Sequence, residues 1–227
     1  MYQTTGIESH QGTKCGTVRR LCLIAAGIST ALPLIVSVPA PVGATSALRE
    51  TTPSPADNCV VDVVAGATKA STERCFSTFT EAIRFATDGA ITNAPPTAIE
   101  GVDDPALNAL LGSTEKSDDP QESTAPAGAL IVIGIEYEHA NYGGASYTFR
   151  GSRRCTTPTT DIDYSLNLPR HWWDRISSFR NYNNCFTNHY AFSGFVPPST
   201  GYLNDRAVMP IIGGRNFNDD ARSIRWS

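Results

Sequence analysis

The chain has 227 residues, a net charge of −4 and only 18% charged residues. This balance argues against a nucleic-acid binder, because affinity for phosphate depends on clustered Lys and Arg. No P-loop, GxGxxG or HExxH motif occurs in the sequence. The common signatures of nucleotide binding and zinc proteolysis are therefore excluded.

The first segment, residues 1–44, has the features of a secretory signal peptide. Three basic residues precede an apolar run at 21–38, and the small residues of PVGA follow. This order predicts export, with cleavage after Ala44. A membrane anchor is the alternative, although a run of about 18 residues is near the lower limit for a span and Pro33 interrupts it. We expect a secreted, extracellular protein without membrane contact after cleavage.

Four cysteines remain in the mature chain: Cys59, Cys75, Cys155 and Cys185. They allow three pairings, and an oxidising compartment favours disulfides over free thiols. The long gap in sequence after the second cysteine favours Cys59–Cys75 and Cys155–Cys185, one bridge per domain. A zinc site is the alternative, but no CxxC or paired-histidine spacing supports it.

The mature chain begins with three segments of different composition. Residues 45–57 are rich in Thr, Ser and Pro, which predicts a disordered leader. In residues 58–94, CVVDVVAG predicts a strand, and apolar spacing from Phe79 predicts a helix capped by Thr78 or Thr80. This small α+β unit is expected to be pinned by the first disulfide.

Residues 95–128 are expected to form a disordered acidic linker. They hold five prolines and seven carboxylates against one lysine. A segment of such charge without aromatics buries too little apolar surface to become ordered. PALNALL at 105–111 predicts only a transient helical turn, and an acidic binding tail is the alternative reading.

Residues 129–227 predict an all-β domain. Their composition is β-rich, turn signals such as Gly143–Gly144 are frequent, and no helical stripe occurs. These features indicate a compact sandwich or barrel.

The same domain contains a repeat. HWWDRISSFR at 171–180 and FNDDARSIRW at 217–226 share three pairs 45 residues apart: Asp174 and Asp219, Ser178 and Ser223, Arg180 and Arg225. Aromatic residues precede each copy at matching spacings: Tyr137, Tyr142 and Phe149, then Tyr190, Phe195 and Tyr202. A duplicated supersecondary unit, packed as one domain, is the simplest explanation.

In these motifs residues 129–227 resemble the βγ-crystallin family, whose repeat is a four-stranded Greek key. The family folds its first hairpin with aromatic-x4-aromatic-x-Gly, which Tyr137, Tyr142 and Gly144 match in full. The resemblance implies an all-β sandwich of two Greek keys.

The second copy departs from this pattern. It keeps Tyr190 and Phe195 but has Pro197 where glycine is expected. Proline fixes φ near −65° and cannot replace a glycine of positive φ. We expect the second hairpin to turn differently, in a longer loop through VPPST.

The resemblance also implies calcium binding through a loop of two Asn or Asp, two variable residues, Ser or Thr, and Ser. Calcium is held by such carboxylate, carbonyl and hydroxyl oxygens. The first loop, Trp173 to Ser178, lacks only the first acid or amide. The second, Asn218 to Ser223, carries Arg222 at the hydroxyl position, and a guanidinium offers only donors and positive charge.

In this family the two loops lie side by side and exchange ligands. One composite site would keep Asn218 and Ser177, whereas the other would contain Trp173 and Arg222. We therefore predict one calcium ion, bound at about 10⁻⁴–10⁻³ M. Its expected ligands are Asp174, Ser177, Asn218 and Asp219. The alternative is that both loops are degenerate turns held by serine hydrogen bonds.

The predicted function is non-enzymatic: a monomeric calcium-binding protein with a structural or cell-envelope role. Hydrolase activity is set aside because no GxSxG motif occurs. The main alternative is inhibition of an extracellular metallopeptidase, because some secreted bacterial inhibitors have a crystallin-like fold; the segment 153–163 would supply the loop. A further alternative is binding of a cell-wall glycan through Trp172–Trp173.

Overall fold

The computed structural model describes residues 57–112, 129–157 and 159–227. The predicted signal peptide, its cleavage site, nearly all of the predicted leader and residues 113–128 of the predicted linker lie outside the described residues. Within the described ranges, no helix is long and apolar enough to cross a membrane.

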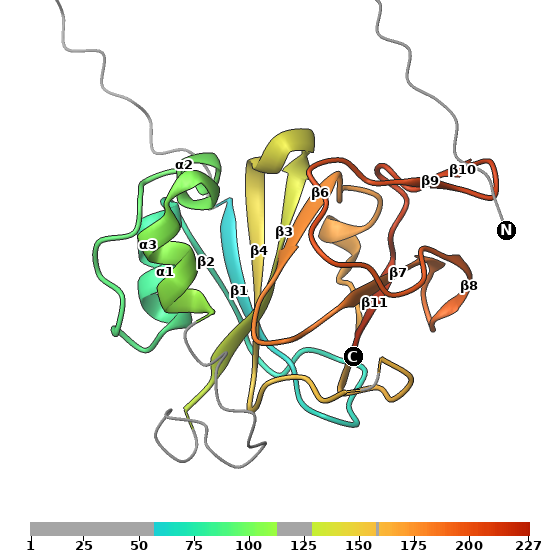
Figure 1. Ribbon diagram of the computed structural model, residues 1–227, viewed down its shortest axis with the longest axis horizontal. Coiled ribbons are helices and arrows are strands. Elements are labelled where there is room, and N and C mark those ends of the chain that lie inside the picture. The colour runs from blue at the N-terminus through green and yellow to red at the C-terminus, as the bar shows by residue number, and fades with distance from the viewer. Residues whose placement is uncertain (1–56, 113–128, 158) are drawn as a thin grey trace, which may run out of the picture. The chain divides into compact units, whose positions relative to one another are not determined.

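Figure 1 shows a five-stranded sheet with the strand order β2-β1-β4-β3-β6. Its strands are β1 (Asn58–Asp62), β2 (Glu73–Phe76), β3 (Ile131–His139), β4 (Gly143–Gly151) and β6 (Ser178–Asn181). Strand β1 runs parallel to β4, and all other neighbours are antiparallel.

A second, four-stranded sheet has the order β5-β11-β7-β8. Its strands are β5 (Tyr164–Asn167), β7 (Thr187–Phe192), β8 (Val196–Ser199) and β11 (Ser223–Trp226). Strand β5 comes from the first half of the repeat but pairs with β11 of the second half. In return, Arg206 of the second half bridges to Phe179 on β6. Each half therefore contributes backbone to the other half's sheet.

Four short elements lie between these strands: η1 (Ala140–Tyr142), η2 (Arg170–Trp172), β9 (Ile211–Ile212) and β10 (Arg215–Asn216). Strands β9 and β10 pair with each other as a separate antiparallel hairpin.

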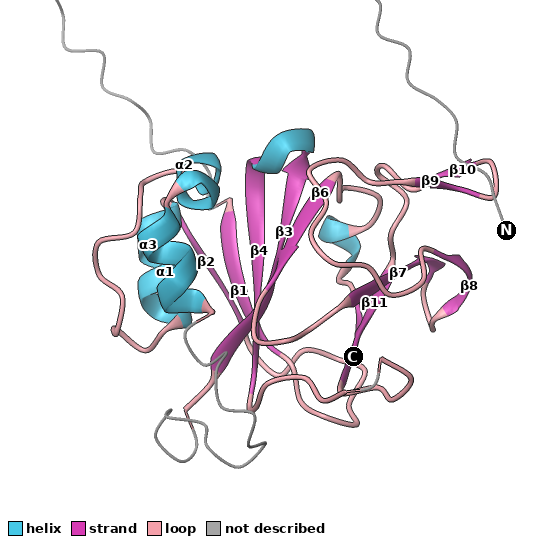
Figure 2. Cartoon of the chain, viewed as in Figure 1, coloured by secondary structure: helices cyan, strands magenta, loops and turns pink. Residues whose placement is uncertain are grey.

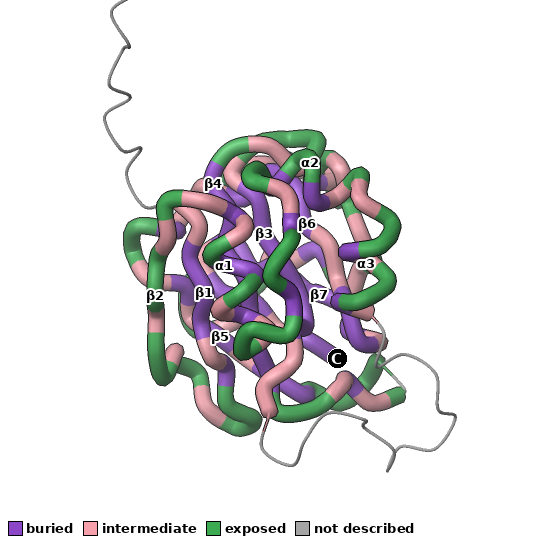
Figure 3. Tube along the Cα trace, turned by 90° about the vertical axis from the view of Figure 1, so that its left-hand side faces the viewer, coloured by how far each residue is buried: buried purple, intermediate pink, exposed green. Residues whose placement is uncertain are grey.

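The five-stranded sheet separates two apolar cores. One core lies against the second sheet and contains the ring pairs Tyr147–Trp172, at 4.8 Å between centroids, and Phe149–Trp226, at 4.7 Å. The other core lies beneath the helices. Because both faces are covered, β3 and β4 are buried along most of their length, whereas the outer strand β2 is largely exposed (Figure 3).

A register shift in β3 directs its side chains into both cores. Pairing with β4 slips between Val132 and Gly134. Val132 and Ile135 both contact the helix-side core, whereas Ile133 belongs to the core between the sheets. Strict alternation along the strand would place Val132 and Ile135 on opposite faces of the sheet. The register shift between them allows both side chains to pack into the same core.

Three helices cover the other face of the five-stranded sheet (Figure 2). They are α1 (Phe79–Ala86), α2 (Ala98–Asp103) and α3 (Pro105–Leu111). The hydroxyl of Thr78 accepts a hydrogen bond from the backbone N–H of Glu81 at the start of α1. Of the two predicted caps, Thr78 is therefore the one used.

The prediction of a disordered linker is wrong for residues 95–112, which contain the helices α2 and α3. Glu100 accepts hydrogen bonds from the backbone N–H and the hydroxyl of Thr97. Asp104 accepts from two backbone N–H groups at the start of α3, whose two buried leucines pack into the helix-side core. These acids act as helix caps, a local role that net charge conceals.

The predicted small unit, residues 58–94, contains the expected strand and helix but is not separate from the β-rich domain. Strand β1 pairs with β4 along its whole length. Arg150 of β4 binds Asp62 at 2.7 Å and Asp88 at 3.0 Å. Without β1, the outer N–H and C=O groups of β4 would have no strand partner. The two segments thus form one sheet.

Both predicted disulfides, Cys59–Cys75 and Cys155–Cys185, are confirmed. The first joins β1 to β2, where its two cysteines are direct partners in the register. The second ties the segment after β4 to the segment before β7.

Candidate metal loops

The two predicted calcium loops lie side by side through matched backbone contacts. The N–H of Asp174 donates to the carbonyl of Ala221 at 3.1 Å, and the N–H of Asp219 donates to the carbonyl of Ile176 at 2.9 Å. Asp174 and Asp219 also share a left-handed backbone, with φ of 56° and 53°. Asp tolerates this conformation better than most residues, which explains its repetition at these positions.

Three of the four predicted ligand residues gather at one corner of this pair. The hydroxyl of Ser177 donates to Oδ1 of Asp219 at 2.9 Å, and Nδ2 of Asn218 donates to Oδ2 of the same carboxylate at 2.7 Å. Among the described residues, Asp219 has no ion pair with Arg or Lys. We call these three residues the oxygen corner, since they combine a carboxylate, a hydroxyl and an amide oxygen.

The fourth predicted ligand, Asp174, lies in the opposite corner and is held by Arg222. Nε of Arg222 donates to Oδ1 of Asp174 at 3.0 Å, and Nη2 donates to Oδ2 at 2.7 Å. This hydrogen-bonded ion pair raises the pKa of the Arg222 guanidinium. The guanidinium also lies 5.3 Å from the ring centroid of Trp173. The departures from the family pattern thus meet in this arginine corner, where a side chain provides the positive charge.

The third position carries a positive side chain in the first loop and a negative one in the second, and each forms an ion pair. Arg175 binds Glu138 at 2.6 Å in the first loop. Its counterpart Asp220 accepts a hydrogen bond from Nη2 of Arg215 at 2.6 Å, which raises the pKa of that arginine. Asp174 and Asp220 therefore both have guanidinium partners, whereas Asp219 has none within the described part of the chain.

The last serine of each loop locks the hairpin of its own half. The Ser178 hydroxyl donates to the carbonyl of His139 at 2.6 Å and accepts from the N–H of Tyr142 at 3.0 Å. The Ser223 hydroxyl makes the same two bonds in the second half, with Phe192 and Phe195 at 2.7 and 3.0 Å. These two serines are not among the site residues predicted from the sequence, because that prediction covers metal ligands and they hold the hairpin turns instead. Their equivalence is nevertheless visible in the sequence, where they are 45 residues apart.

The motif aromatics adopt the same arrangement in both hairpins. Tyr137 and Tyr142 meet edge to face at 5.4 Å, and Tyr190 and Phe195 meet edge to face at 5.9 Å. Gly144 has φ of 77°, and a Cβ there would lie 2.8 Å from the His139 ring. Glycine is therefore required at this position.

The expectation of a longer second hairpin loop is wrong. The chain reverses before Pro197, and residues 196–199 of VPPST form strand β8 rather than a loop. Ser223 holds the second turn as Ser178 holds the first, and the two hairpins have the same register. The missing glycine therefore changes neither the length nor the register of the hairpin, although the backbone at Pro197 differs, with a cis Pro197–Pro198 bond.

The segments behind the alternative functions are also described in part. Trp172 is buried, and Nε1 of the half-buried Trp173 donates to the carbonyl of Leu168 at 2.7 Å. Arginines lie over both of these indole rings, so the pair does not form a free stacking platform. In the segment 153–163, Arg153 binds Asp163 at 2.6 Å.

No family model matches the chain, and no curated protein matches it. Solved structures do match. A βγ-crystallin domain from Flavobacterium johnsoniae is 24% identical, with 42% of this chain and 93% of that chain covered and a TM-score of 0.30. A double mutant of a βγ-crystallin domain from Clostridium beijerinckii is 19% identical, with coverage of 41% and 94% and a TM-score of 0.30. Hahellin, a βγ-crystallin, is 21% identical, with coverage of 42% and 91% and a TM-score of 0.28. The chain is thus similar, over about 42% of its length, to bacterial βγ-crystallin domains.

Proposed function

We propose that the protein is a secreted, non-enzymatic protein of βγ-crystallin type that binds one calcium ion at the oxygen corner. The observation that carries this proposal is the charge balance of the two loops. Asp174 and Asp220 have guanidinium partners, whereas the side-chain partners of the Asp219 carboxylate in the described ranges are the neutral donors Ser177 and Asn218.

The ligand chemistry of the oxygen corner suits calcium. A carboxylate, a hydroxyl, an amide oxygen and nearby loop carbonyls are hard oxygen ligands, and water can complete a coordination number of six to eight. The bonds that Ser177 and Asn218 now donate to Asp219 would be replaced by bonds from their oxygens to the ion. The arginine corner would exclude a second ion, because a fixed guanidinium repels a divalent cation.

The role we propose for the ion is structural. Ser177 belongs to the first loop, and Asn218 and Asp219 belong to the second, so the ion would fasten one half of the repeat to the other. At a calcium concentration ten times the Kd, this linkage stabilises the folded state by about 1.4 kcal/mol. Two disulfides accord with an oxidising, extracellular location.

For residues 129–227 we propose two Greek keys, one for each half of the repeat, that exchange their third strands. The pairing of β5 with β11 and the bridge of Arg206 to Phe179 support this topology, because each joins one half of the repeat to the other.

Calorimetric titration of calcium into the oxidised, chelator-treated chain tests the function. One ion per chain is expected, with binding weakened about tenfold or more in Ser177→Ala and Asn218→Ala. Asp103→Asn, an exposed acid on α2, is the matched control and should bind normally. Two ions, or no heat from a folded chain, would overturn the proposal; the second result would make metallopeptidase inhibition the function to test.

A further inference from the structure

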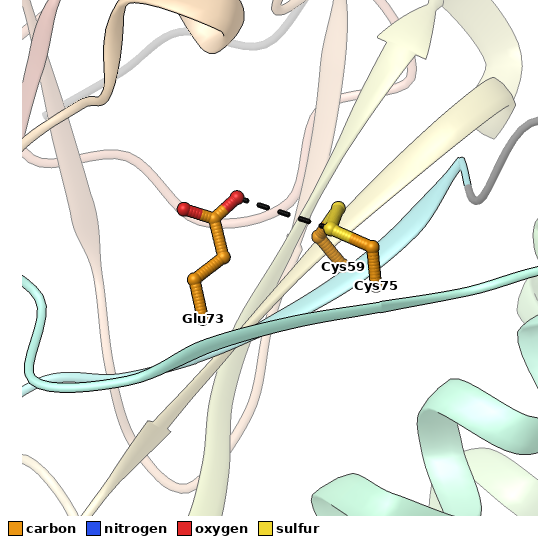
Figure 4. A group of neighbouring side chains, drawn as sticks. All are labelled: Cys59, Glu73 and Cys75. Atoms are coloured by element: carbon orange, nitrogen blue, oxygen red, sulfur yellow. Dashed lines mark hydrogen bonds between the residues drawn. A yellow bond between two sulfur atoms is a disulfide. The ribbon is translucent and has the colours of Figure 1, made fainter.

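A disulfide and a carboxylate lie together on the outer strand of the five-stranded sheet (Figure 4), and an imidazole contacts the carboxylate. Glu73 precedes Cys75 by two residues on β2, so both side chains lie on the same face of the strand. The possible ligand atoms of Cys59, Glu73 and Cys75 all lie within 4.8 Å of one another. Oε1 of Glu73 is 3.9 Å from Sγ of Cys75; this is a contact, since a disulfide sulfur carries no proton.

The imidazole comes from a part of the chain far away in sequence. His171 of η2 places Nε2 at 2.7 Å from Oε1 of Glu73. Both side chains are accessible, at 55% exposed for His171 and 26% for Glu73. Within the described part of the chain, the ion pair of Glu73 is with this histidine and not with Arg or Lys. Burial and the nearby Glu73 carboxylate raise the pKa of the Tyr147 phenol.

These four residues are a zinc ligand set when the cysteines are reduced. Zinc is held in tetrahedral sites by thiolate sulfur, imidazole nitrogen and carboxylate oxygen. We propose that Cys59, Cys75, Glu73 and His171 bind one zinc ion in the reduced chain, and that closure of the disulfide expels it.

A dithiol can reduce the Cys59–Cys75 disulfide and so make both sulfurs available to zinc. The dithiol gives two electrons and two protons to the Cys59–Cys75 bond and becomes a disulfide, while the protein gains two thiols. Zinc then replaces the two thiol protons, which pass to solvent. Oxidation by a disulfide reverses the sequence: a sulfur–sulfur bond forms, the ligands are lost and the ion leaves.

The site forms only if its side chains move. With metal–ligand bonds of about 2.0–2.3 Å, tetrahedral ligand atoms lie roughly 3.3–3.8 Å apart. The Glu73–His171 contact of 2.7 Å must widen, and the two sulfurs, bonded to each other in the disulfide, must separate. The imidazole must also approach the sulfurs, because His171 lies outside the group of ligand atoms that are within 4.8 Å of one another. These movements fall on the accessible side chains of Cys75, Glu73 and His171, while Cys59 stays in the buried strand β1.

The other disulfide provides an internal comparison. Cys155 and Cys185 are 2% and 3% exposed, and Sγ of Cys185 lies 3.6 Å from a backbone carbonyl. Among the described residues, no histidine or carboxylate joins them in a group able to hold a metal. Reduction of that pair exposes two thiols without the other ligands.

The test uses the full chain with Cys15→Ser and Cys22→Ser, which removes the N-terminal thiols. The chain is reduced with a phosphine in the absence of oxygen and titrated with Zn²⁺, with Co²⁺ as the optical probe. We expect one ion per reduced chain, with the thiolate-to-cobalt absorption of two sulfur ligands, and no binding at this position after reoxidation. Glu73→Gln and His171→Ala should each weaken zinc binding at least roughly tenfold, and Cys59→Ser with Cys75→Ser should abolish it.

Matched controls separate the site from general effects of reduction. His139→Ala and Glu81→Gln change an exposed histidine and an exposed glutamate outside the cluster, and both should bind zinc normally. Cys155→Ser with Cys185→Ser should retain the absorption. Circular dichroism of each oxidised variant verifies folding, and the single changes at Glu73 and His171 suffice if the cysteine variant does not fold. Failure of the reduced chain to bind zinc, or full affinity in either single variant, would overturn the proposal. Calcium titration uses the oxidised chain, so the two tests fail independently.

Discussion

The two corners of the paired loops have the same backbone but opposite contents. Asp174 and Asp219 share their conformation and donate equivalent hydrogen bonds across the pair. One corner contains the guanidinium of Arg222, whereas the described residues of the other corner contribute oxygens and neutral donors. A duplicated scaffold can therefore keep its backbone geometry while one corner contains a side-chain cation and the other does not.

The largest effect we predict is the gain of a second calcium site when the arginine corner is converted into a set of oxygen ligands. Trp173→Asn combined with Arg222→Ser supplies the amide and the hydroxyl that this corner lacks and frees Asp174. Calorimetry should then count two calcium ions per chain instead of one, because both corners would present oxygen ligands. Arg222→Ser alone is the matched control and should still bind one ion. If the double variant is folded and binds a single ion, the side chains are not what distinguishes the corners.

The serine locks test whether the two halves remain equivalent away from the metal. Ser178→Ala and Ser223→Ala each remove two hydrogen bonds from a fully buried hydroxyl. Each should reduce the free energy of unfolding by about 1–3 kcal/mol, since a backbone donor and acceptor lose their partner. Urea denaturation without calcium measures this. Ser152→Ala, an exposed serine, is the control, and a large difference between the two variants would show that the locks are unequal.

Removing the Glu138–Arg175 pair at the third loop position should have the smallest effect on stability, and the effect should appear only at acidic pH. Burial favours a raised pKa for Glu138, but hydrogen bonds from Arg175 and the N–H of Ala145 lower it below its ordinary value. A carboxylate with a depressed folded pKa contributes stability above its unfolded pKa, about 4.3, and loses it as pH falls through the folded value. Melting temperatures between pH 6 and pH 3 should fall more for the wild type than for Glu138→Gln. Parallel curves would assign no stabilising role to the Glu138–Arg175 pair.

Local patterns predicted much of the β-rich domain. The gap between the cysteines predicted both disulfides. The aromatic spacing and the repeated loop motif pointed to the family resemblance, which implied the first hairpin and the adjacent loops. For the ligand set, the sequence grouped Asp174 with the oxygen corner, because it cannot show that Arg222 reaches across to take that carboxylate.

Other features have no local signal. The parallel pairing of β1 with β4 joins strands separated by two segments of unrelated composition. The capping roles of Glu100 and Asp104 were hidden by the acidic composition of the predicted linker. Glu73 and His171 are 98 positions apart, and neither lies in a recognisable metal motif, so only the folded chain brings them together.

The parallel strand β1 has a consequence for proteolysis. Each disulfide closes within one side of the stretch 113–128, so a peptide-bond cut there would leave no covalent link between the two products. Strand β1, Asp62 and Asp88 would still hold Arg150 and the edge of β4. The products should therefore stay together as a nicked complex and separate only under denaturing conditions. A protease acting on that stretch would produce a two-chain protein rather than a free crystallin-like domain.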